Sequence, residues 1–263
     1  MTKVNYHMHT TRCKHAKGSD EDYVLEAIKN GYTSIGFSDH CVWKYDTECH
    51  SKIRMELDEF PNYKESVLYL KEKYKDQIEI LFGMEVEYFP KYMNWMKQFI
   101  IDQNLDYVIF GNHFYQSEEL NIYYGNCDLD YVDSYFDMCI EGMKTGIYSY
   151  LAHPELIMRN RYLTWNDAIE KRFADVCIAA KELDIPLEYN LLGLQYNVMN
   201  RCECYPHHKF WELTHKVGNK VIIGMDAHQQ SDLSNELYNY AYDDLKSMGI
   251  EPIQSIELKK WEK

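Results

Sequence analysis

Six short apolar runs of this sequence each end in a side chain that can bind a metal ion. The runs cover residues 4–9, 35–40, 80–85, 107–113, 148–153 and 221–228, and they end in histidine, in glutamate or, in the last run, in Asp226 and His228. Packing alone does not explain this pattern, because a buried polar side chain without a partner costs free energy. Imidazole and carboxylate groups are common ligands of zinc, manganese and iron. The pattern therefore predicts a polynuclear metal site, and with it hydrolytic chemistry.

The first and last runs carry ligand pairs at alternate positions. His7 and His9 are two residues apart, and alternate side chains of a strand point to the same face, so both imidazoles can reach one cation. Asp226 and His228 repeat this spacing. In a closed barrel the first and last strands are neighbours, and we therefore expect Asp226 to complete the site of His7 and His9. The alternatives are half-buried or surface histidines and, for Asp226, a helix cap.

Glu85 is the predicted bridge between two cations. It ends a buried run, where an isolated carboxylate has to be paired or bound to a metal. Its two oxygens can contact two cations, which an imidazole cannot do. His113 and His153 each supply one imidazole to the second cation. Glu87 shares a face with Glu85, and it either supports this site by hydrogen bonding or is solvated.

A third, all-nitrogen site can be formed by His15, His40 and His228. His15 lies in a loop and His40 ends the second run, directly after Asp39. Asp39 is an alternative ligand, or it orients a histidine from outside the ligand set.

The elements that must position these side chains alternate between strands and helices. We expect strands over residues 3–9, 34–39, 78–87, 107–113, 148–153, 186–190 and 221–226, and helices over 21–30, 63–74, 91–103, 130–144, 166–183, 207–217 and 235–248. Gly31, Gly146 and Gly218 follow three of these helices, where a left-handed residue is favoured. This order predicts a parallel sheet. Seven such units favour a closed α/β barrel, a (β/α)7 TIM-like barrel with its active site at the C-terminal ends of the strands.

We expect a single domain over residues 1–263, because the sequence shows no linker, internal repeat or low-complexity stretch. Two irregular insertions, residues 40–59 and 114–129, follow ligand-bearing strand ends. Long loops at that end of a barrel commonly contact substrate, and these two are predicted to do so.

Composition excludes some classes of partner. The formal net charge of −14 argues against a nucleic-acid backbone or an anionic membrane as the main partner. We expect no membrane-spanning segment and no signal peptide, and hence a cytoplasmic protein. The eight cysteines form no CxxC pairs and are expected to be reduced thiols. Cys202 and Cys204 are poorly spaced for tetrahedral zinc, and we assign no metal to them.

Seven motifs in order carry a resemblance to a known family. HxHT, CxHAxG, FSDH, GxExxYxP, GNHF, AHPE and GMDAH span residues 6–228. The set resembles the PHP (polymerase and histidinol phosphatase) family, and most closely its monofunctional histidinol-phosphatase branch. The resemblance implies a distorted (β/α)7 barrel with three divalent metal ions, which are Zn, Mn or Fe. It implies that His7, His9, Glu85 and Asp226 bind the first ion, that Glu85, His113 and His153 bind the second, and that His15, His40 and His228 bind the third.

The same resemblance implies an activity, the hydrolysis of L-histidinol phosphate to L-histidinol and phosphate in histidine biosynthesis. Its substrate is small and phosphorylated. Arg159 would neutralise the phosphoryl oxygens in the transition state, and Asp226 or His228 would pass a proton to the leaving oxygen.

The resemblance implies two phosphate-binding arginines, and this sequence matches one of them clearly. Arg159 follows His153 at the expected place, with Arg161 in reserve. The other position, after the sixth strand, holds Gln195, and the nearest arginine after it is Arg201.

Three alternatives stay open. The first is a PHP-type phosphoesterase that acts on another small phosphate ester, a nucleotide or an oligonucleotide. The second is a related amidohydrolase, although such enzymes bridge their metals from the fourth strand and lack the CxHAxG motif. The third is a non-catalytic metal-binding domain, although such domains usually lose ligands.

Overall fold

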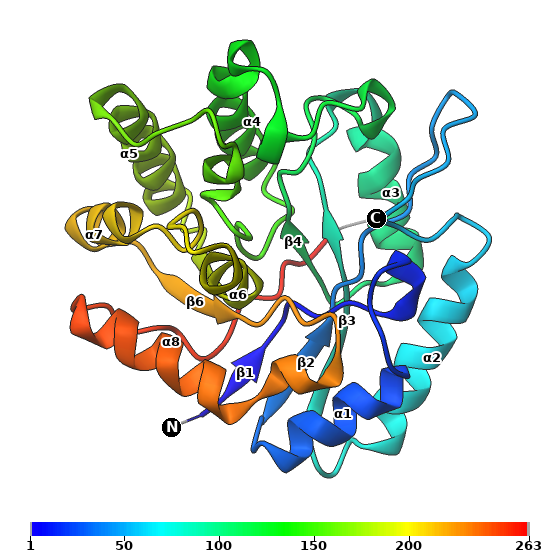
Figure 1. Ribbon diagram of the computed structural model, residues 1–263. Coiled ribbons are helices and arrows are strands. Elements are labelled where there is room, and N and C mark those ends of the chain that lie inside the picture. Colours follow the sequence, from blue (N-terminus) through cyan, green and yellow to red (C-terminus); the bar gives the residue numbers. More distant parts are fainter. Residues whose placement is uncertain (1, 262–263) are drawn as a thin grey trace.

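The computed structural model describes residues 2–261 as an α/β barrel surrounded by helices (Figure 1). One parallel sheet has the order β1 (Val4–Asn5), β2 (Ser34–Phe37), β3 (Glu79–Val86) and β4 (Tyr107–Phe110), and a second sheet pairs β5 (Leu187–Asn190) with β6 (Val221–Gly224). Isolated bridges link Leu151 to Phe110 on one side and to Leu187 on the other. A further bridge between Met8 and Ala227 closes the ring. The predicted distorted TIM-like barrel is confirmed.

The segment 148–153 occupies the fifth barrel position but is not a regular strand, so this part of the prediction is wrong. Leu151 N donates to Pro186 O at 3.0 Å and Ala152 N donates to Phe110 O at 2.9 Å, so the segment bonds to both neighbours. Its extended course ends at His153, where φ is +30°. The chain turns there before a regular ladder is established.

Seven helices lie close to their predicted ranges: α1 (Asp20–Lys29), α2 (Phe60–Lys73), α3 (Met93–Gln103), α4 (Val132–Lys144), α5 (Asp167–Glu182), α7 (His208–Val217) and α8 (Asn235–Ser247). Gly31, Gly146 and Gly218 have φ of +74°, +73° and +79°, which confirms the predicted left-handed helix ends. Within residues 2–261, no helix combines the length and the apolar character needed to cross a bilayer.

One helix, α6 (Leu191–Asn200), was not expected from the sequence. Its first residues are Leu-Leu-Gly-Leu, which give no clear polar face and place a weak helix former near the start. The structure supplies a cap, because Asn190 Oδ1 accepts a hydrogen bond from Gly193 N at 2.8 Å. The helix therefore starts at the end of β5, next to the barrel mouth.

Tyr107 fills the barrel interior below the ligand-bearing strand ends. Its hydroxyl lies 2.8 Å from Tyr6 O and 3.1 Å from Phe37 O, so its single proton is shared between two carbonyl oxygens and this buried polar group is satisfied. A Cβ at Gly36 or Gly83 would lie within 2.4 Å of the Tyr107 side chain, so both strands need glycine beside the ring. This packed interior leaves the mouth of the barrel as the place where the polar side chains gather.

Candidate metal centre

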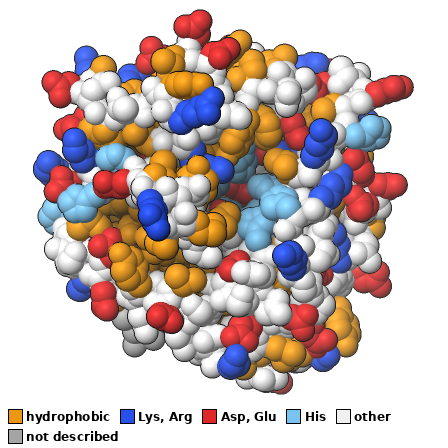
Figure 2. Space-filling model, viewed as in Figure 1, with side chains coloured by type: hydrophobic (Ala, Val, Ile, Leu, Met, Phe, Trp, Pro, Cys, Tyr) orange, Lys and Arg blue, Asp and Glu red, His pale blue; other side chains and the backbone are white. Residues whose placement is uncertain are grey.

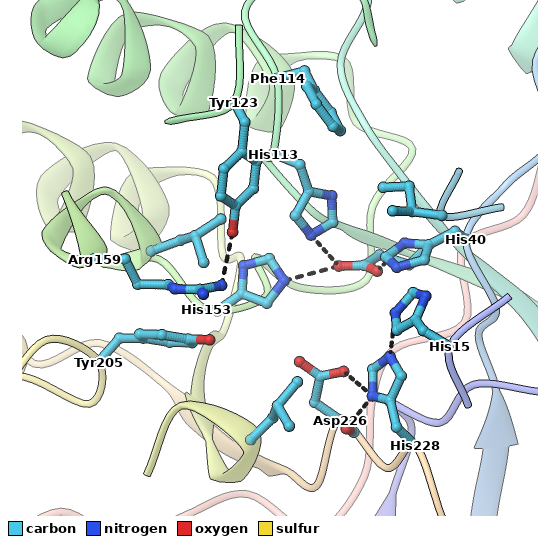
Figure 3. Close-up of a pocket in the computed structure, with 14 residues that line it drawn as sticks. His15, His40, His113, Phe114, Tyr123, His153, Arg159, Tyr205, Asp226 and His228 are labelled. Carbon is cyan, nitrogen blue, oxygen red and sulfur yellow. Dashed lines mark hydrogen bonds and ion pairs between the residues drawn. The ribbon is translucent and has the colours of Figure 1, made fainter. Parts of the chain in front are cut away.

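All nine predicted metal ligands lie together at the C-terminal mouth of the barrel. Eight of them lie at, or just beyond, the ends of barrel segments, and His15 comes from the loop after the first segment. In the view of Figure 2, histidine side chains gather around a hollow near the middle of this face. Figure 3 shows six of them pointing toward one another from different parts of the chain: His15, His40, His113, His153, Asp226 and His228. Parallel strands in a barrel end at one mouth, which explains why ligands far apart in the sequence meet here.

Glu85 lies at the centre of the cluster and is fully buried. Its Oε1 lies 2.9 Å from His153 Nε2 and 3.3 Å from His113 Nε2. Its Oε2 faces other imidazoles, with His40 Nδ1 at 2.8 Å and His9 Nε2 at 3.7 Å. The two oxygens of one carboxylate thus face different sets of imidazoles, which is the arrangement that a bridging ligand requires.

Asp226 completes a second group with the histidine pair. Its Oδ1 lies 3.1 Å from His9 Nε2 and 3.4 Å from His7 Nε2. The bridge between Met8 and Ala227 sets these distances, because it places the residues on either side of Met8 beside Asp226.

Several polar atoms of this cluster are buried and, within residues 2–261, have no partner in the geometry of a normal hydrogen bond, although some of them face another atom of the cluster at short distance. They are His7 Nε2, His9 Nδ1 and Nε2, His40 Nδ1, His153 Nδ1, Glu85 Oε2 and Asp226 Oδ1. Most of them point at the cluster centre, as the short distances above show. Buried polar atoms are normally satisfied, and imidazole and carboxylate are suitable ligands for Zn, Mn and Fe. The residues present therefore fit divalent metal ions.

His15, His40 and His228 form a separate group whose ligand atoms all lie within 4.8 Å of one another. His15 Nδ1 lies 2.6 Å from Cys13 O, and His228 Nδ1 lies 2.9 Å from Asp226 O. A carbonyl oxygen can only accept, so each Nδ1 carries the proton and each Nε2 offers a lone pair. These two Nε2 atoms are 2.9 Å apart. Two facing lone pairs at this distance repel each other unless a cation lies near both, so this group also fits a metal ion.

The electrostatics of the site separate neutral from charged side chains. Burial lowers the pKa of His40 and of His228 to about 3, and the charge of His9 acts in the same direction. Burial also acts against the charged form of His9, but the nearby carboxylates of Asp226, Asp39 and Glu85 raise its pKa to about 9. Neighbouring imidazoles hold the pKa of Glu85 well below its usual range despite burial. Ionised carboxylates and neutral imidazoles are the forms that bind a cation, so a metal ion bound at His9 would displace the proton of this imidazole.

Two carboxylates stand behind the ligands and orient them. Glu188 Oε1 accepts from His7 Nδ1 at 2.8 Å, and Glu87 Oε1 accepts from His113 Nδ1 at 3.1 Å. In both histidines Nε2 is thereby left free to face the cluster. Asp39 lies behind His9, with Oδ1 3.5 Å from Nδ1.

Sequence reasoning missed Glu188, although a signal was present. Glu188 and Asn190 alternate at the end of β5, as Glu85 and Glu87 do at and just beyond the end of β3, and Asn190 Nδ2 donates to Glu188 Oε2 at 2.9 Å. A Cβ at Gly224 would lie 1.8 Å from Glu188 Oε1. The neighbouring strand β6 therefore needs glycine where Glu188 turns toward His7.

Two of the predicted ligands, His153 and Asp226, have unusual backbone conformations. The φ of His153 is +30° and that of Asp226 is +47°, in the region that favours glycine. Such strain is commonly stored at functional sites, where the surrounding structure holds it in place. Here it turns each side chain off its strand end into the cluster.

Beside the cluster lies a cavity of about 530 Å³, which also contains Arg159. Arg159 Nη1 donates to Tyr123 OH at 2.9 Å, and its guanidinium lies 4.4 Å from the centre of the Tyr196 ring. Tyr205 lines the same wall (Figure 3). The three tyrosines were not singled out from the sequence, because nothing distinguishes them from the other 21.

The rest of the cavity wall is apolar and comes partly from the two insertions. Ile53 belongs to residues 40–59, and Phe114 and Tyr123 belong to residues 114–129. Leu156 and Leu192 complete the wall. A mainly apolar cavity with a few convergent polar groups is typical of a small-molecule site.

The structure does not bring two of the predicted substrate-binding arginines to this cavity. Arg161 is exposed and its Nη2 donates to Tyr162 OH at 2.6 Å. Arg201 is the exposed C-cap of α6, with φ of +53°. Both lie outside the cavity lining, with side chains exposed to solvent. Gln195 lines a different pocket, between α6 and α8, so it does not simply replace an arginine in the wall.

Comparisons with known proteins agree with this geometry. A family model described as PHP domain matches residues 5–191. The histidinol-phosphatase of Bacillus subtilis is 23% identical in an alignment of 272 positions, which covers 92% of this chain and 98% of that protein. A protein of Deinococcus radiodurans described as a probable histidinol-phosphatase is 24% identical, with 86% of each chain covered.

A solved structure has a fold similar to that of this chain. The histidinol phosphate phosphatase of Lactococcus lactis, in complex with zinc, L-histidinol and phosphate, matches with a TM-score of 0.75 and 19% identity, and the match covers 97% of this chain and 99% of that one. The match to the family model extends over more than half of the sequence and includes His7, His9, Glu85, His113 and His153. This chain therefore belongs to the PHP domain family.

Proposed function

We propose that this protein is a metal-dependent phosphate monoester hydrolase whose substrate is L-histidinol phosphate. One observation carries the proposal: seven of the nine predicted metal-ligand side chains and one guanidinium line a single cavity, and the other two, His7 and His9, lie directly behind Asp226. The names of the Bacillus and Lactococcus proteins, and the ligands of the latter, support the choice of substrate.

We assign three divalent ions, Zn, Mn or Fe, to three overlapping ligand sets. His7, His9, Glu85 and Asp226 would hold the first, Glu85, His113 and His153 the second, and His15, His40 and His228 the third. Such ions supply Lewis acidity toward phosphoryl oxygens and lower the pKa of water.

Arg159 binds and orients the phosphoryl group in this proposal. Tyr123 OH accepts from Nη1 at 2.9 Å, and the Tyr196 ring supports the guanidinium plane, so the fork is held in one orientation. A guanidinium matches two phosphoryl oxygens at once. Because it lies in the same cavity as Glu85 and Asp226, it fixes the phosphorus beside the metal ligands.

Asp226 or His228 would take a proton from the attacking water and pass it to the leaving oxygen. Asp226 Oδ2 is held by Asn190 Nδ2 at 3.1 Å, while its Oδ1 lies 3.5 Å from His228 Nδ1. The two groups lie on the same edge of the cavity (Figure 3). The apolar wall of Ile53, Phe114 and Leu192 would receive the organic part of the ester and exclude bulk water.

The test compares phosphate release from several esters by one protein preparation. Protein is stripped with a chelator, reloaded separately with Zn, Mn and Fe, and assayed with L-histidinol phosphate, adenosine monophosphate, p-nitrophenyl phosphate and a short oligonucleotide. We expect kcat/KM to be highest for L-histidinol phosphate and to be lost after stripping. Full activity of stripped protein would contradict the metal centre, and a preference for the nucleotide or oligonucleotide would contradict the substrate.

A further inference from the structure

Arg54 is a charged side chain buried in the cover of the site. The cover consists of the two insertions, residues 40–59 and 114–129, which contribute Ile53, Phe114 and Tyr123 to the cavity wall. Arg54 is 1% exposed. A guanidinium that is removed from water has to be neutralised by well-placed acceptors, or its burial is costly.

Three acceptors from three parts of the chain surround Arg54. Its Nη2 donates to Glu87 Oε1 at 2.6 Å and its Nη1 donates to Glu87 Oε2 at 3.0 Å, which makes a bidentate pair. Its Nε donates to Glu118 Oε2 at 2.7 Å, and Nη1 also donates to Cys41 O at 3.0 Å. Glu87 lies just beyond the end of β3, Glu118 in the second insertion and Cys41 at the start of the first. One guanidinium therefore ties the barrel to both parts of the cover.

Glu118 links the two insertions to each other. It accepts from Ser51 Oγ at 2.6 Å and from Tyr45 OH at 3.1 Å, both in the first insertion, in addition to Arg54 Nε. These bonds hold the two insertions as one unit. Ile53, which faces the cavity, is the direct neighbour of Arg54 in the chain.

Glu87 connects this unit to a proposed metal ligand. Its Oε1 receives Arg54 Nη2 and also His113 Nδ1, at 3.1 Å, while Oε2 receives Trp43 Nε1 at 3.1 Å. The position of the His113 ring thus depends on a carboxylate whose own position is set by Arg54. His113 Nε2 in turn lies 3.3 Å from Glu85 Oε1.

We propose that Arg54 is a positioning residue that couples the seating of the cover to the orientation of His113, through Glu87. When the cover is seated, the guanidinium locks Glu87, Glu87 holds the proton of His113 on Nδ1, and Nε2 faces Glu85. The inference rests on the proposed metal centre. It assigns a role to a side chain that touches neither the cavity nor the ligand cluster.

Shape as well as charge is needed at this position. A lysine in place of Arg54 keeps the charge, but one ammonium cannot hold both Glu87 oxygens and Glu118 in a plane. A methionine keeps the length and removes the charge, which leaves two buried carboxylates without their cation. The proposal therefore predicts graded effects on metal binding for Arg54→Lys and Arg54→Met.

The experiment uses the full chain with four substitutions. Arg54→Lys and Arg54→Met cut the network at its centre, and Glu118→Gln cuts only its connection to the second insertion. Arg172→Met is the matched control, because Arg172 pairs with Asp137 between helices α5 and α4 and belongs to no part of this network. Thermal unfolding identifies variants that are folded before any other measurement is made.

Two measurements separate positioning from general stability. The first is the number of metal ions bound and their affinity, from elemental analysis after equilibration against buffered free Zn or Mn. We expect Arg54→Met to lower the affinity of one ion, the one assigned to Glu85, His113 and His153, about 10- to 100-fold, with a smaller loss for Arg54→Lys and wild-type binding for Arg172→Met. The second is the long-range proton–nitrogen spectrum of the histidine rings in metal-free protein, where we expect the Nδ1-protonated signal of His113 to change in both Arg54 variants.

Glu118→Gln tests the contribution of the cover separately from that of the metal ligands. Arg54, Glu87 and His113 stay connected in this variant, so we expect metal affinity to stay within twofold of wild type while KM rises at least threefold. It also keeps the proposal testable if both Arg54 variants fail to fold.

Specific results would overturn the proposal. They are a folded Arg54→Met protein with wild-type metal affinity and an unchanged His113 spectrum, or a Glu118→Gln protein with unchanged KM. If wild-type protein binds no ion, the proposed metal centre fails. The ring spectra of the metal-free protein then still decide whether Arg54 orients His113.

Discussion

Replacement of Glu188 by glutamine tests whether His7 needs an acceptor-only partner. Glu188 is fully buried, and three donors converge on it: His7 Nδ1 at 2.8 Å on Oε1, and His153 N at 3.0 Å and Asn190 Nδ2 at 2.9 Å on Oε2. A carboxylate satisfies all three. An amide has one oxygen and one NH2 group, so one side of the new side chain has to face a donor.

The structure indicates which side this will be. The N–H of His153 belongs to the backbone and cannot give up its proton, so the amide oxygen takes the Oε2 position. The NH2 group then faces His7 Nδ1, and the imidazole proton has to move to Nε2. That atom lies 3.4 Å from Asp226 Oδ1 and 3.6 Å from Glu85 Oε1, at the place proposed for the first cation. A protonated Nε2 cannot bind a metal ion.

The expected loss is about 10- to 100-fold in metal affinity, which corresponds to about 1.4 to 2.7 kcal/mol. In the opposite amide orientation the NH2 group faces the donors His153 N and Asn190 Nδ2. Each buried group left unsatisfied costs about 1 to 3 kcal/mol, so this orientation is not more favourable than the first. Metal content at buffered free Zn or Mn, kcat for phosphate release and thermal unfolding are measured together. Glu182→Gln, an exposed change at the end of α5, is the control.

A folded Glu188→Gln protein that binds ions with wild-type affinity and has a kcat within twofold of wild type would refute this role of Glu188. A loss of stability without any change in metal affinity would also contradict it, because Glu188 would then act only in packing.

The remaining predictions concern the phosphate clamp, a close strand contact and a buried acid. Arg159→Met should lower kcat/KM about 10- to 100-fold, because it removes charge-assisted hydrogen bonds to phosphate. Arg161→Met should keep kcat/KM within twofold of wild type, and equal losses of kcat/KM in the two variants would contradict the assignment of Arg159 to the phosphoryl group. Gly224→Ala would place a Cβ 1.8 Å from Glu188 Oε1, so we expect about 1 to 3 kcal/mol less stability in denaturant titrations and weaker metal binding; full metal affinity would contradict it. Burial raises the pKa of Glu155 to about 8 in the folded state, above the value of 4.5 in the unfolded state. Between these two pH values the folded state therefore binds one proton more than the unfolded state, and the free energy of unfolding falls as the pH rises from 4.5 to about 8. Glu155→Gln should remove this dependence and gain a few kcal/mol over wild type between pH 5 and pH 8 in chelator-treated protein; parallel pH profiles of the two proteins would show that Glu155 is ionised.

The fold was largely predictable because local patterns and the global topology agree. Buried strands appear as β-branched and aromatic runs, and glycines such as Gly31 and Gly218 mark helix ends through their positive φ. Two elements were not predicted correctly for physical reasons. The segment around Leu151 bonds to both neighbours but turns early at His153, and α6 has no polar face to reveal it in the sequence.

By itself the sequence determined which side chains end the barrel strands, and therefore the members of the candidate metal cluster. Parallel strands all point their C-terminal ends to one mouth, so order along the chain is enough to bring His7, Glu85 and Asp226 together. The tertiary structure alone decided which groups stand behind them. Glu188 and Arg54 act through contacts with residues 181 and 33 positions away, to His7 and Glu87. No local spacing encodes such contacts, because they depend on how the insertions and neighbouring strands pack.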